Sequence, residues 1–268
     1  VGLTTAQVAA LTSAQIIQGL TTTQIAAMET SDVVALTTAQ LNYLTTAQIA
    51  GLSTTAFLSL NTSAVASLKT SQIVALNTAQ VAALNTTTLN ALTSIQIWAL
   101  EVVDLAVLST SNLAALTTLQ LRGLKITQLN GLSTTQLESL TTTTLSQLSS
   151  TQWNGLNGSQ LSGLSAATLG ELNTAKVLSL STAQISGLSS TALSRLSTSA
   201  LSILDVKQIV SLTTHQLSTL STTGLKALST RQIAALETQD IAVLSSSNIA
   251  ALSSAQLKAL STRQIAAL

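Results

Sequence analysis

The sequence predicts an all-α solenoid of very short capped helices, one in each eight-residue repeat, around a continuous leucine and isoleucine core. Two observations lead to this prediction. One is an eight-residue repeat that ends in leucine, and the other is a helix-capping pattern at the start of each repeat. LSTRQIAAL at residues 228–236 returns unchanged at 260–268 and represents the repeat well. Repeats of this kind indicate that one small structural unit stacks on the next.

The repeat is nearly unbroken along the chain. From Leu20 onward every eighth residue is leucine, except Met28. The unit TSAQIIQGL at residues 12–20 has nine residues, and Leu3 and Leu11 continue the pattern before it. Residues 4–268 therefore hold about 33 units of eight residues, here called octads, plus one inserted residue. We number the octad positions 1 to 8, with leucine at position 8.

Positions 1 and 4 carry a signal for the start of a helix. Position 1 is Ser, Thr, Asn or Asp in most octads, and the side-chain oxygen of these residues accepts hydrogen bonds from the free N–H groups of a first helical turn. Position 4 is most often Gln, which completes the reciprocal capping box. Each octad is therefore expected to begin a new helix.

Positions 5 and 8 are the apolar positions, and they lie on one face of a helix because they are three residues apart. One long helix is excluded, since eight residues advance a helix by about 800° and the leucines would drift by about 80° per octad. A half-buried strand is excluded because the apolar spacing does not follow a period of two. Two, three or four octads per coil all remain open.

A second level of repetition appears when the sequence is shifted by 136 residues. TSIQIWALEVVDLAVLSTSNLAAL at 93–116 aligns with STRQIAALETQDIAVLSSSNIAAL at 229–252. Two octads that lack Gln at position 4, those with Ala56 and Ala64, align with the octads of Ala192 and Ala200. We therefore predict a single octad solenoid over residues 1–268 that arose by internal duplication, with copies at roughly 1–132 and 133–268.

Composition limits the classes of partner. Charged residues make up 7% of the chain and the net charge is +1, so no strong field attracts nucleic acid. The absence of cysteine excludes disulfides and thiolate metal sites. Because no apolar run approaches the roughly 18 to 20 residues of a membrane span, we expect no membrane insertion.

Few residues are candidates for chemistry. His215 is the only histidine and has no Asp, Glu or Cys close by in the sequence to complete a metal site. Because no Gly-x-Ser-x-Gly elbow appears, we predict no catalytic residue and no cofactor, and an enzyme is the least expected class. Glu at position 1 always occurs with Asp at position 4, in the pairs Glu29/Asp32, Glu101/Asp104 and Glu237/Asp240. Carboxylates at a helix N-terminus suit the helix dipole, and the alternative is a weak calcium site between adjacent coils.

The aromatic residues divide into two groups. Phe57 and Trp153 occupy position 5 and are expected in the core, whereas Tyr43 at position 7 and Trp98 at position 6 are candidates for an exposed contact patch. Positions 2, 3 and 6 should face outward, and they are mostly Thr, Ser and Ala. Such a surface favours lateral packing, O-linked glycans or an ice-binding face.

LTTAQVAAL, LTTAQIAGL and LSTRQIAAL resemble the Leu-Thr-Thr-Ala-Gln-Ile-Ala-Ala octapeptide repeat tracts of very large bacterial secreted or cell-surface proteins of adhesin type. The resemblance covers essentially the whole chain. It implies an elongated extracellular scaffold, stalk or filament that associates with itself end to end or laterally. The alternative function is a binding module that displays an adhesin or ice-binding face.

Overall fold

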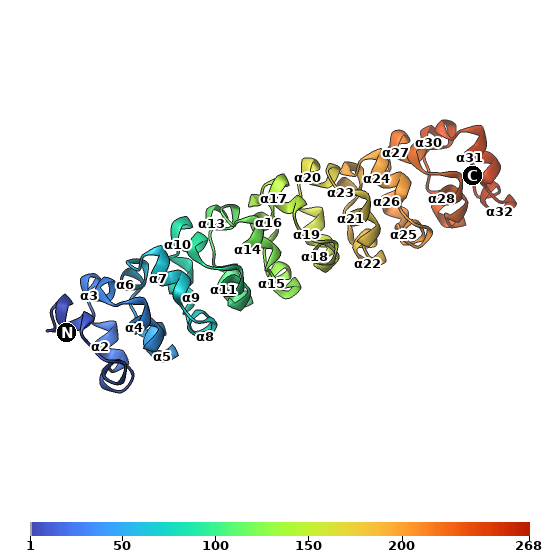
Figure 1. Cartoon of the computed structure of the whole chain (residues 1–268). Coiled ribbons are helices and arrows are strands. Elements are labelled where there is room, and N and C mark those ends of the chain that lie inside the picture. The colour runs from blue at the N-terminus through green and yellow to red at the C-terminus, as the bar shows by residue number, and fades with distance from the viewer. Residues whose placement is uncertain (1) are drawn as a thin grey trace. The chain divides into compact units, whose positions relative to one another are not determined.

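In a computed structural model of the chain, which describes residues 2–268, short helices follow one another throughout and no strand occurs in that range (Figure 1). The chain divides into two compact units, Val1–Leu132 (unit 1) and Ser133–Leu268 (unit 2). Their boundary falls where the two sequence copies meet. The duplication and the single solenoid over 1–268 stay predictions from the sequence. The predicted all-α solenoid class is confirmed within each unit.

The helices have four to six residues each. Unit 1 contains α1 (Thr5–Ala9), η1 (Gln15–Gly19), α2 (Thr22–Ala26), α3 (Thr30–Ala35), α4 (Thr38–Tyr43), α5 (Thr46–Gly51), α6 (Thr54–Leu58), α7 (Thr62–Ser67), α8 (Thr70–Val74), α9 (Thr78–Ala82), α10 (Thr86–Ala91), α11 (Ser94–Ala99), α12 (Val102–Ala106), α13 (Thr110–Ala114), α14 (Thr118–Arg122) and α15 (Ile126–Asn130). Unit 2 contains α16 (Thr134–Ser139), α17 (Thr142–Ser146), α18 (Ser150–Gly155), α19 (Gly158–Ser162), α20 (Ala166–Gly170), α21 (Thr174–Ser179), α22 (Thr182–Gly187), α23 (Ser190–Arg195), α24 (Thr198–Ile203), α25 (Val206–Val210), α26 (Thr214–Ser218), α27 (Thr222–Ala227), α28 (Thr230–Ala235), α29 (Thr238–Ala242), α30 (Ser246–Ala251), α31 (Ser254–Ala259) and α32 (Thr262–Ile265).

The predicted capping box starts most of these helices. At α5, Thr45 has extended backbone angles, and its hydroxyl accepts a hydrogen bond from the Gln48 N–H at 3.2 Å. The Gln48 side-chain oxygen accepts from the Thr45 N–H at 2.8 Å. The helix ends at Leu52, where the backbone returns to φ −59° and ψ 136°. Within residues 2–268 no residue has a positive φ, so these turns do not depend on glycine.

Positions 5 and 8 form the core, as predicted. Ile49 and Leu52 of one octad have exposed fractions of 0% and 2%, and the same burial recurs along both units. Phe57 and Trp153 are buried at position 5. Because a helix of five residues is unstable alone in water, this shared core supplies the stability that each octad lacks.

One coil contains between three and four octads. In unit 1, α2 packs against α5, α8 against α11 and α11 against α14, so each helix contacts the third helix after it. Position 7 of one octad meets position 2 of an octad three earlier, as Gly187 meets Gly158 in unit 2. Side-chain hydrogen bonds described below span 28 and 31 residues, which is between three and four octads. The sequence left the number of octads per coil open, and these contacts place it between three and four.

The nine-residue unit is accommodated locally. Thr12 and Gln15 form the usual reciprocal cap, and the inserted residue widens the following turn into the π-helix η1. A π-helical turn is the common response of a helix to one extra residue. Ile16 and Leu20 still accept hydrogen bonds from Gln48 of the next coil, so the insertion leaves the stacking intact.

Candidate functional site

A ladder of buried glutamine side chains joins successive coils within each unit. Gln80 is fully buried, and its side-chain oxygen accepts from the Asn77 N–H at 2.9 Å. Its side-chain nitrogen donates to the carbonyl oxygens of Ile49 at 3.0 Å and Leu52 at 2.8 Å. The same pair of carbonyl bonds, 31 and 28 residues back, is made by Gln72, Gln96, Gln120, Gln128, Gln184, Gln208, Gln216, Gln232 and Gln256. We call these residues with Gln80 the glutamine ladder.

Each ladder residue caps two helices at once. The last carbonyl groups of a helix lack the usual helical partners. The position-5 carbonyl accepts from the position-8 N–H of its own octad, as Ile49 does from Leu52, and can accept a second bond, while the position-8 carbonyl lies beyond the helix. A primary amide has one acceptor oxygen and two N–H donors. The oxygen therefore caps the start of its own helix, and the two donors cap the end of the helix in the coil beneath.

Sequence reasoning found only half of this role. The capping box accounts for the acceptor oxygen, and Glu could supply that oxygen equally well. Position 4 is occupied by Gln, Asn, Asp, Ala, Thr, Lys or Gly, but in no octad by Glu. This preference for an amide over a carboxylate is the signal that could have revealed the contact between coils.

Other side chains replace the ladder residue at some octads. Asn112 and Asn248 are shorter, and each donates to the carbonyl 28 residues back, those of Leu84 and Leu220. Arg195 donates to the Leu164 carbonyl at 2.9 Å in the octad where Ala192 occupies position 4. Lys176 donates to the Ser146 carbonyl, and burial lowers the pKa of its amine. Amide, guanidinium and ammonium groups can therefore all donate the hydrogen bond between coils.

The three acidic pairs lie at the starts of α3, α12 and α29. In each pair Glu is exposed, whereas Asp32, Asp104 and Asp240 are buried at the ladder position. The carboxylates of Asp104 and Asp240 accept from the Glu101 and Glu237 N–H groups at 3.1 and 3.0 Å. Desolvation by burial raises the pKa of both Asp104 and Asp240. No group of three metal-binding side chains occurs in residues 2–268, and the calcium hypothesis stays an untested prediction.

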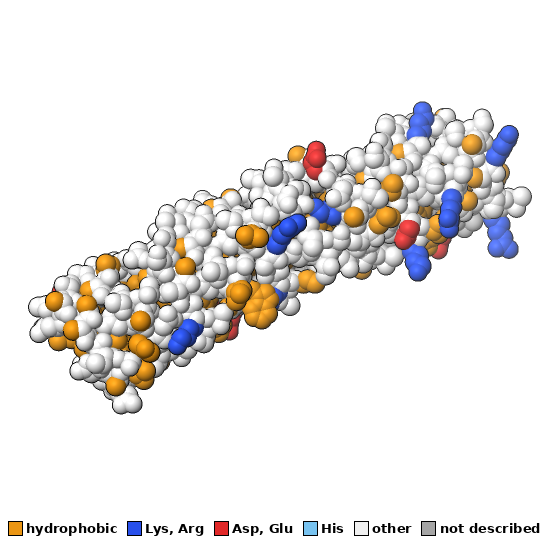
Figure 2. Space-filling model, viewed as in Figure 1, with side chains coloured by type: hydrophobic (Ala, Val, Ile, Leu, Met, Phe, Trp, Pro, Cys, Tyr) orange, Lys and Arg blue, Asp and Glu red, His pale blue; other side chains and the backbone are white. Residues whose placement is uncertain are grey.

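Trp98 belongs to an apolar patch on unit 1, formed by Ile95, Trp98, Leu119 and Ile126. Their side chains are 65%, 52%, 73% and 38% exposed, and α11 packs against α14. The Lys125 ammonium lies 3.8 Å from the centre of the Trp98 ring, a cation–π contact between octads of successive coils. Figure 2 shows hydrophobic side chains gathered in this part of unit 1 on an otherwise mostly polar surface. Tyr43 is 44% exposed but lies on α4, which packs against η1 and α7.

Unit 2 lacks this apolar patch. The residues 136 positions further along are Arg231, Ala234, Ala255 and Thr262, which are polar or small. The core beneath is retained, since Ile97 and Leu100 correspond to Ile233 and Leu236, all of them buried. The patch is therefore not a requirement of the fold.

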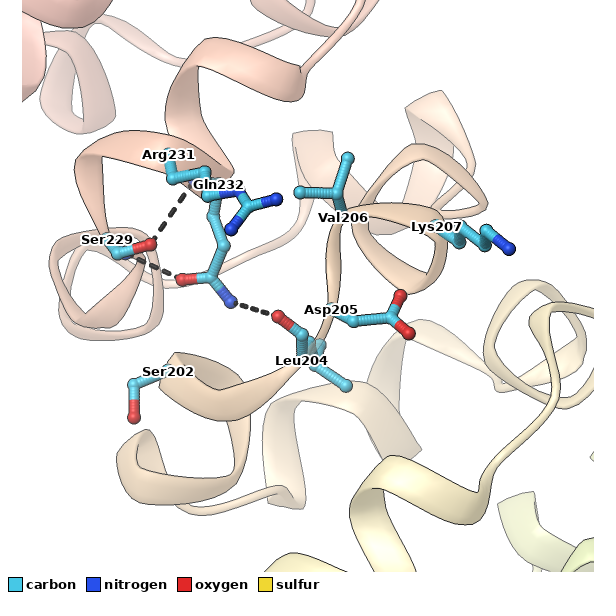
Figure 3. A pocket seen from close by; sticks show the side chains of 8 residues that line it. All are labelled: Ser202, Leu204, Asp205, Val206, Lys207, Ser229, Arg231 and Gln232. Carbon is cyan, nitrogen blue, oxygen red and sulfur yellow. Dashed lines mark hydrogen bonds between the residues drawn. The ribbon is translucent and has the colours of Figure 1, made fainter.

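A shallow cleft of about 360 Å³ lies between α24, α25 and α28 of unit 2 (Figure 3). Its lining residues are Ser202, Leu204, Asp205, Val206, Lys207, Ser229, Arg231 and Gln232. Gln232 donates to the Leu204 carbonyl across it, and Asp205 accepts from the Gln208 N–H at 2.8 Å. Gln232 and Asp205 therefore already serve the ladder and a helix cap.

Stacked octads with a shared core and a buried ladder define a helical repeat protein of the solenoid class. The sequence matches the ALTTAQ repeat family over residues 25–62, 57–86, 97–134 and 233–268, together about half of the chain. The chain therefore belongs to the ALTTAQ repeat family. The predicted octapeptide-repeat assignment is confirmed, whereas the adhesin setting stays a prediction. A comparison with curated proteins gave no match.

The helices within residues 2–268 are short, with four to six residues each. A helix must have about 20 apolar residues to cross a bilayer. Residues 2–268 contain no helix that is long and apolar enough to do so.

Proposed function

We propose that this chain is a structural scaffold, used as an extracellular spacer, stalk or filament, and that it performs no catalysis. The observation that carries the proposal is the glutamine ladder. Gln80 and its equivalents place their polar groups inside the stack, where these groups bond neighbouring coils. A repeat protein whose buried polar groups join one unit to the next is suited to extension by adding units.

The same contact supports end-to-end association. Each coil offers amide donors to the coil on one side and carbonyl acceptors to the coil on the other, as Gln128 and Leu100 do. Any two coils built from these octads are complementary in this sense. A second copy of the chain can therefore stack by the contact that the chain already makes with itself.

The exposed surface supports lateral contacts and an extracellular setting. In a typical octad, residues 45–52, Thr46 and Ala47 are exposed and carry no charge. A nearly neutral Ser, Thr and Ala surface has little electrostatic repulsion to keep copies apart. The exposed hydroxyl groups also offer sites for O-linked glycans, which belong to the same proposal.

Sedimentation velocity and negative-stain electron microscopy over a wide concentration range test the filament. Assemblies that grow with concentration are expected. A monomer that persists unchanged at the highest concentration contradicts self-association. Removal of glycans from protein secreted by its natural host tests the glycan part separately.

The apolar patch favours a second candidate function, a binding module on a rigid repeat scaffold. Unit 2 shows that the fold does without these side chains, so the fold itself does not account for Ile95, Trp98 and Leu119. Exposed aromatic and aliphatic groups gathered on a polar surface are typical of a contact site. A partner with a complementary apolar surface fits this patch.

A patch-exchange variant separates the two functions. Ile95→Arg, Trp98→Ala, Leu119→Ala and Ile126→Thr give unit 1 the residues that unit 2 already carries, so folding should be retained. If the patch is a lateral contact between copies, the variant loses lateral association in sedimentation and keeps end-to-end stacking. Thermal hysteresis of ice growth tests the ice-binding alternative directly, and its absence at high protein concentration removes that alternative.

A further inference from the structure

Asp104 and Asp240, two of the three buried aspartates at ladder positions, stand where Gln and Asn side chains donate to the coil beneath. Asp104 and Asp240 are 3% and 2% exposed, and they are 136 residues apart, at the same place in the two units. A Gln or Asn at this position donates N–H to a carbonyl. An ionised carboxylate can only accept hydrogen bonds. It therefore brings a negative charge toward the carbonyl oxygens and donates no hydrogen bond to them.

Asparagine shows which carbonyl an aspartate would reach. Asn and Asp have side chains of the same length and shape, and Asn112 and Asn248 each donate to the carbonyl 28 residues back. The same register places Leu76 beneath Asp104 and Leu212 beneath Asp240. A protonated carboxyl group has an O–H donor and can make this bond.

We propose that Asp104 and Asp240 are rungs of the ladder that form only in acid, where a rung is one ladder-position side chain that donates a hydrogen bond to the coil beneath. Each donates a hydrogen bond to the leucine carbonyl of the coil beneath when its carboxyl group is protonated, and loses that bond when it is ionised. The contact between two coils in each unit is therefore tighter in acid than at neutral pH. The inference is independent of the scaffold function, because it concerns only the contact between coils.

The charged groups around each rung differ. Asp104 has Glu101 on its own helix and Lys125 at the start of α15, which packs against α12, while α9 brings no titratable group. Asp240 has Glu237 on its own helix, and the two helices packed against α29 bring His215 on α26 and Arg263 on α32.

The net effect of these surroundings on the pKa of both aspartates is in the proposed direction. Desolvation is the largest cause of the raised pKa at both aspartates, and the adjacent Glu101 or Glu237 charge adds to it. The hydrogen bond from the Glu N–H acts in the opposite direction. Because the folded state holds the proton more tightly than the unfolded chain, stability falls as pH rises through the raised pKa.

The first test is a ¹³C NMR titration of the side-chain carboxyl groups in the wild-type chain, in buffer with EDTA so that no cation contributes. Asp104 and Asp240 are expected to titrate clearly above the ordinary aspartate value of about 3.9. Titration at or below that value overturns the proposal. This measurement needs no variant.

The second test is the pH dependence of Tm for the double variant Asp104→Asn with Asp240→Asn. Wild-type Tm is expected to rise by about 2 to 4 °C between pH 7 and pH 4, and the variant should lack this rise. The variant should also be at least as stable as the wild type at pH 7, because Asn donates at any pH. The proposal is overturned if the variant keeps the full acid rise.

The matched control changes the exposed member of each pair, Glu101→Gln with Glu237→Gln. It removes the same number of charges at the same helix starts but leaves both rungs titratable. The acid rise should persist, slightly reduced because the neighbouring negative charge is gone. Loss of the whole rise in this control assigns the effect to the glutamates and contradicts the proposal.

Discussion

The side-chain nitrogen of Gln80 donates to the carbonyl oxygen of Leu52 at 2.8 Å, although the two residues are 28 positions apart. One fully buried amide thus ends a helix of one coil while its oxygen starts a helix of the next. Neither helix is long enough to be stable alone. Removing this amide should therefore weaken two helices and the contact between two coils.

Gln80→Glu tests the donor and keeps the size of the side chain. Its carboxylate can still accept from the Asn77 N–H, but it removes the amide donor from the carbonyls of Ile49 and Leu52, of which Ile49 keeps only the Leu52 N–H. We expect the free energy of unfolding to fall by about 2 to 3 kcal/mol at pH 7, since buried polar groups lose their partner. Urea unfolding followed by circular dichroism at 222 nm measures the change.

Gln24→Glu is the control for that experiment. Gln24 caps the Thr21 N–H at 2.9 Å in the same way, but its side chain is exposed. The change should cost less than about 0.5 kcal/mol, as expected for an exposed site. Equal losses at Gln24 and Gln80 would show that capping alone matters and that the ladder does not.

Deletion of Ile17 should be tolerated. Ile17 is 44% exposed within η1, and its removal restores an ordinary octad that keeps Ile16 and Leu20 as partners of Gln48. Deletion of Ala82, an exposed residue of an ordinary octad, instead pulls Leu84 out of register with Asn112. We expect a change within about 1 kcal/mol for the first deletion and a loss of at least about 3 kcal/mol for the second. Comparable thermal unfolding of the two deletions would be inconsistent with a π-helix that absorbs the insertion.

Gly158→Ala should destabilise unit 2. A methyl group at Gly158 would lie 2.7 Å from the carbonyl oxygen of Gly187, and backbone atoms cannot move aside easily. A cost of about 1 to 3 kcal/mol is typical of such overpacking. At Gly170 no atom lies within 4 Å of the added methyl group, so Gly170→Ala should be neutral or stabilising by up to about 1 kcal/mol. Thermal unfolding of both variants gives the comparison, and a harmless Gly158→Ala would contradict the close coil contact.

Lys176→Gln should stabilise unit 2 at neutral pH. Burial lowers the pKa of Lys176, so the folded state binds its proton less tightly than the unfolded chain. The stability that this residue contributes is therefore greatest at alkaline pH and is lost as pH falls through the lowered pKa. Gln can form an ordinary rung to Leu145 and Leu148, and we expect a gain of about 1 kcal/mol at pH 7 that shrinks toward pH 10.

The exposed Lys207 provides the control for that change. Lys207→Gln removes the same charge without adding a rung, so it should leave the free energy of unfolding within about 0.5 kcal/mol of the wild type. A gain of equal size at both positions would indicate a general effect of charge.

The sequence was sufficient for the local structure and the core. Interactions within one octad explain the capping at Thr45 and Gln48 and the burial of Ile49 and Leu52. These interactions recur because the octad sequence recurs. The aromatic residues were placed correctly on the same basis, with Trp153 buried and Trp98 exposed.

The arrangement between coils could not be predicted in the same way. The 28-residue separation between Gln80 and Leu52 depends on the angle by which each octad turns the chain. Packing between octads sets that angle, and no single residue type does. The raised pKa of Asp104 also depends on the coil beneath it, which the local sequence does not identify.

The most direct test of the ladder is NMR of the Gln80 side-chain amide in isotopically labelled protein. Its protons are expected to exchange slowly with solvent and to show nuclear Overhauser effects to residues 49–52. The exposed Gln24 amide should exchange quickly in the same sample. Rapid exchange at Gln80, or contacts to octads at any other spacing, would contradict the stacking of capped helices through a glutamine ladder.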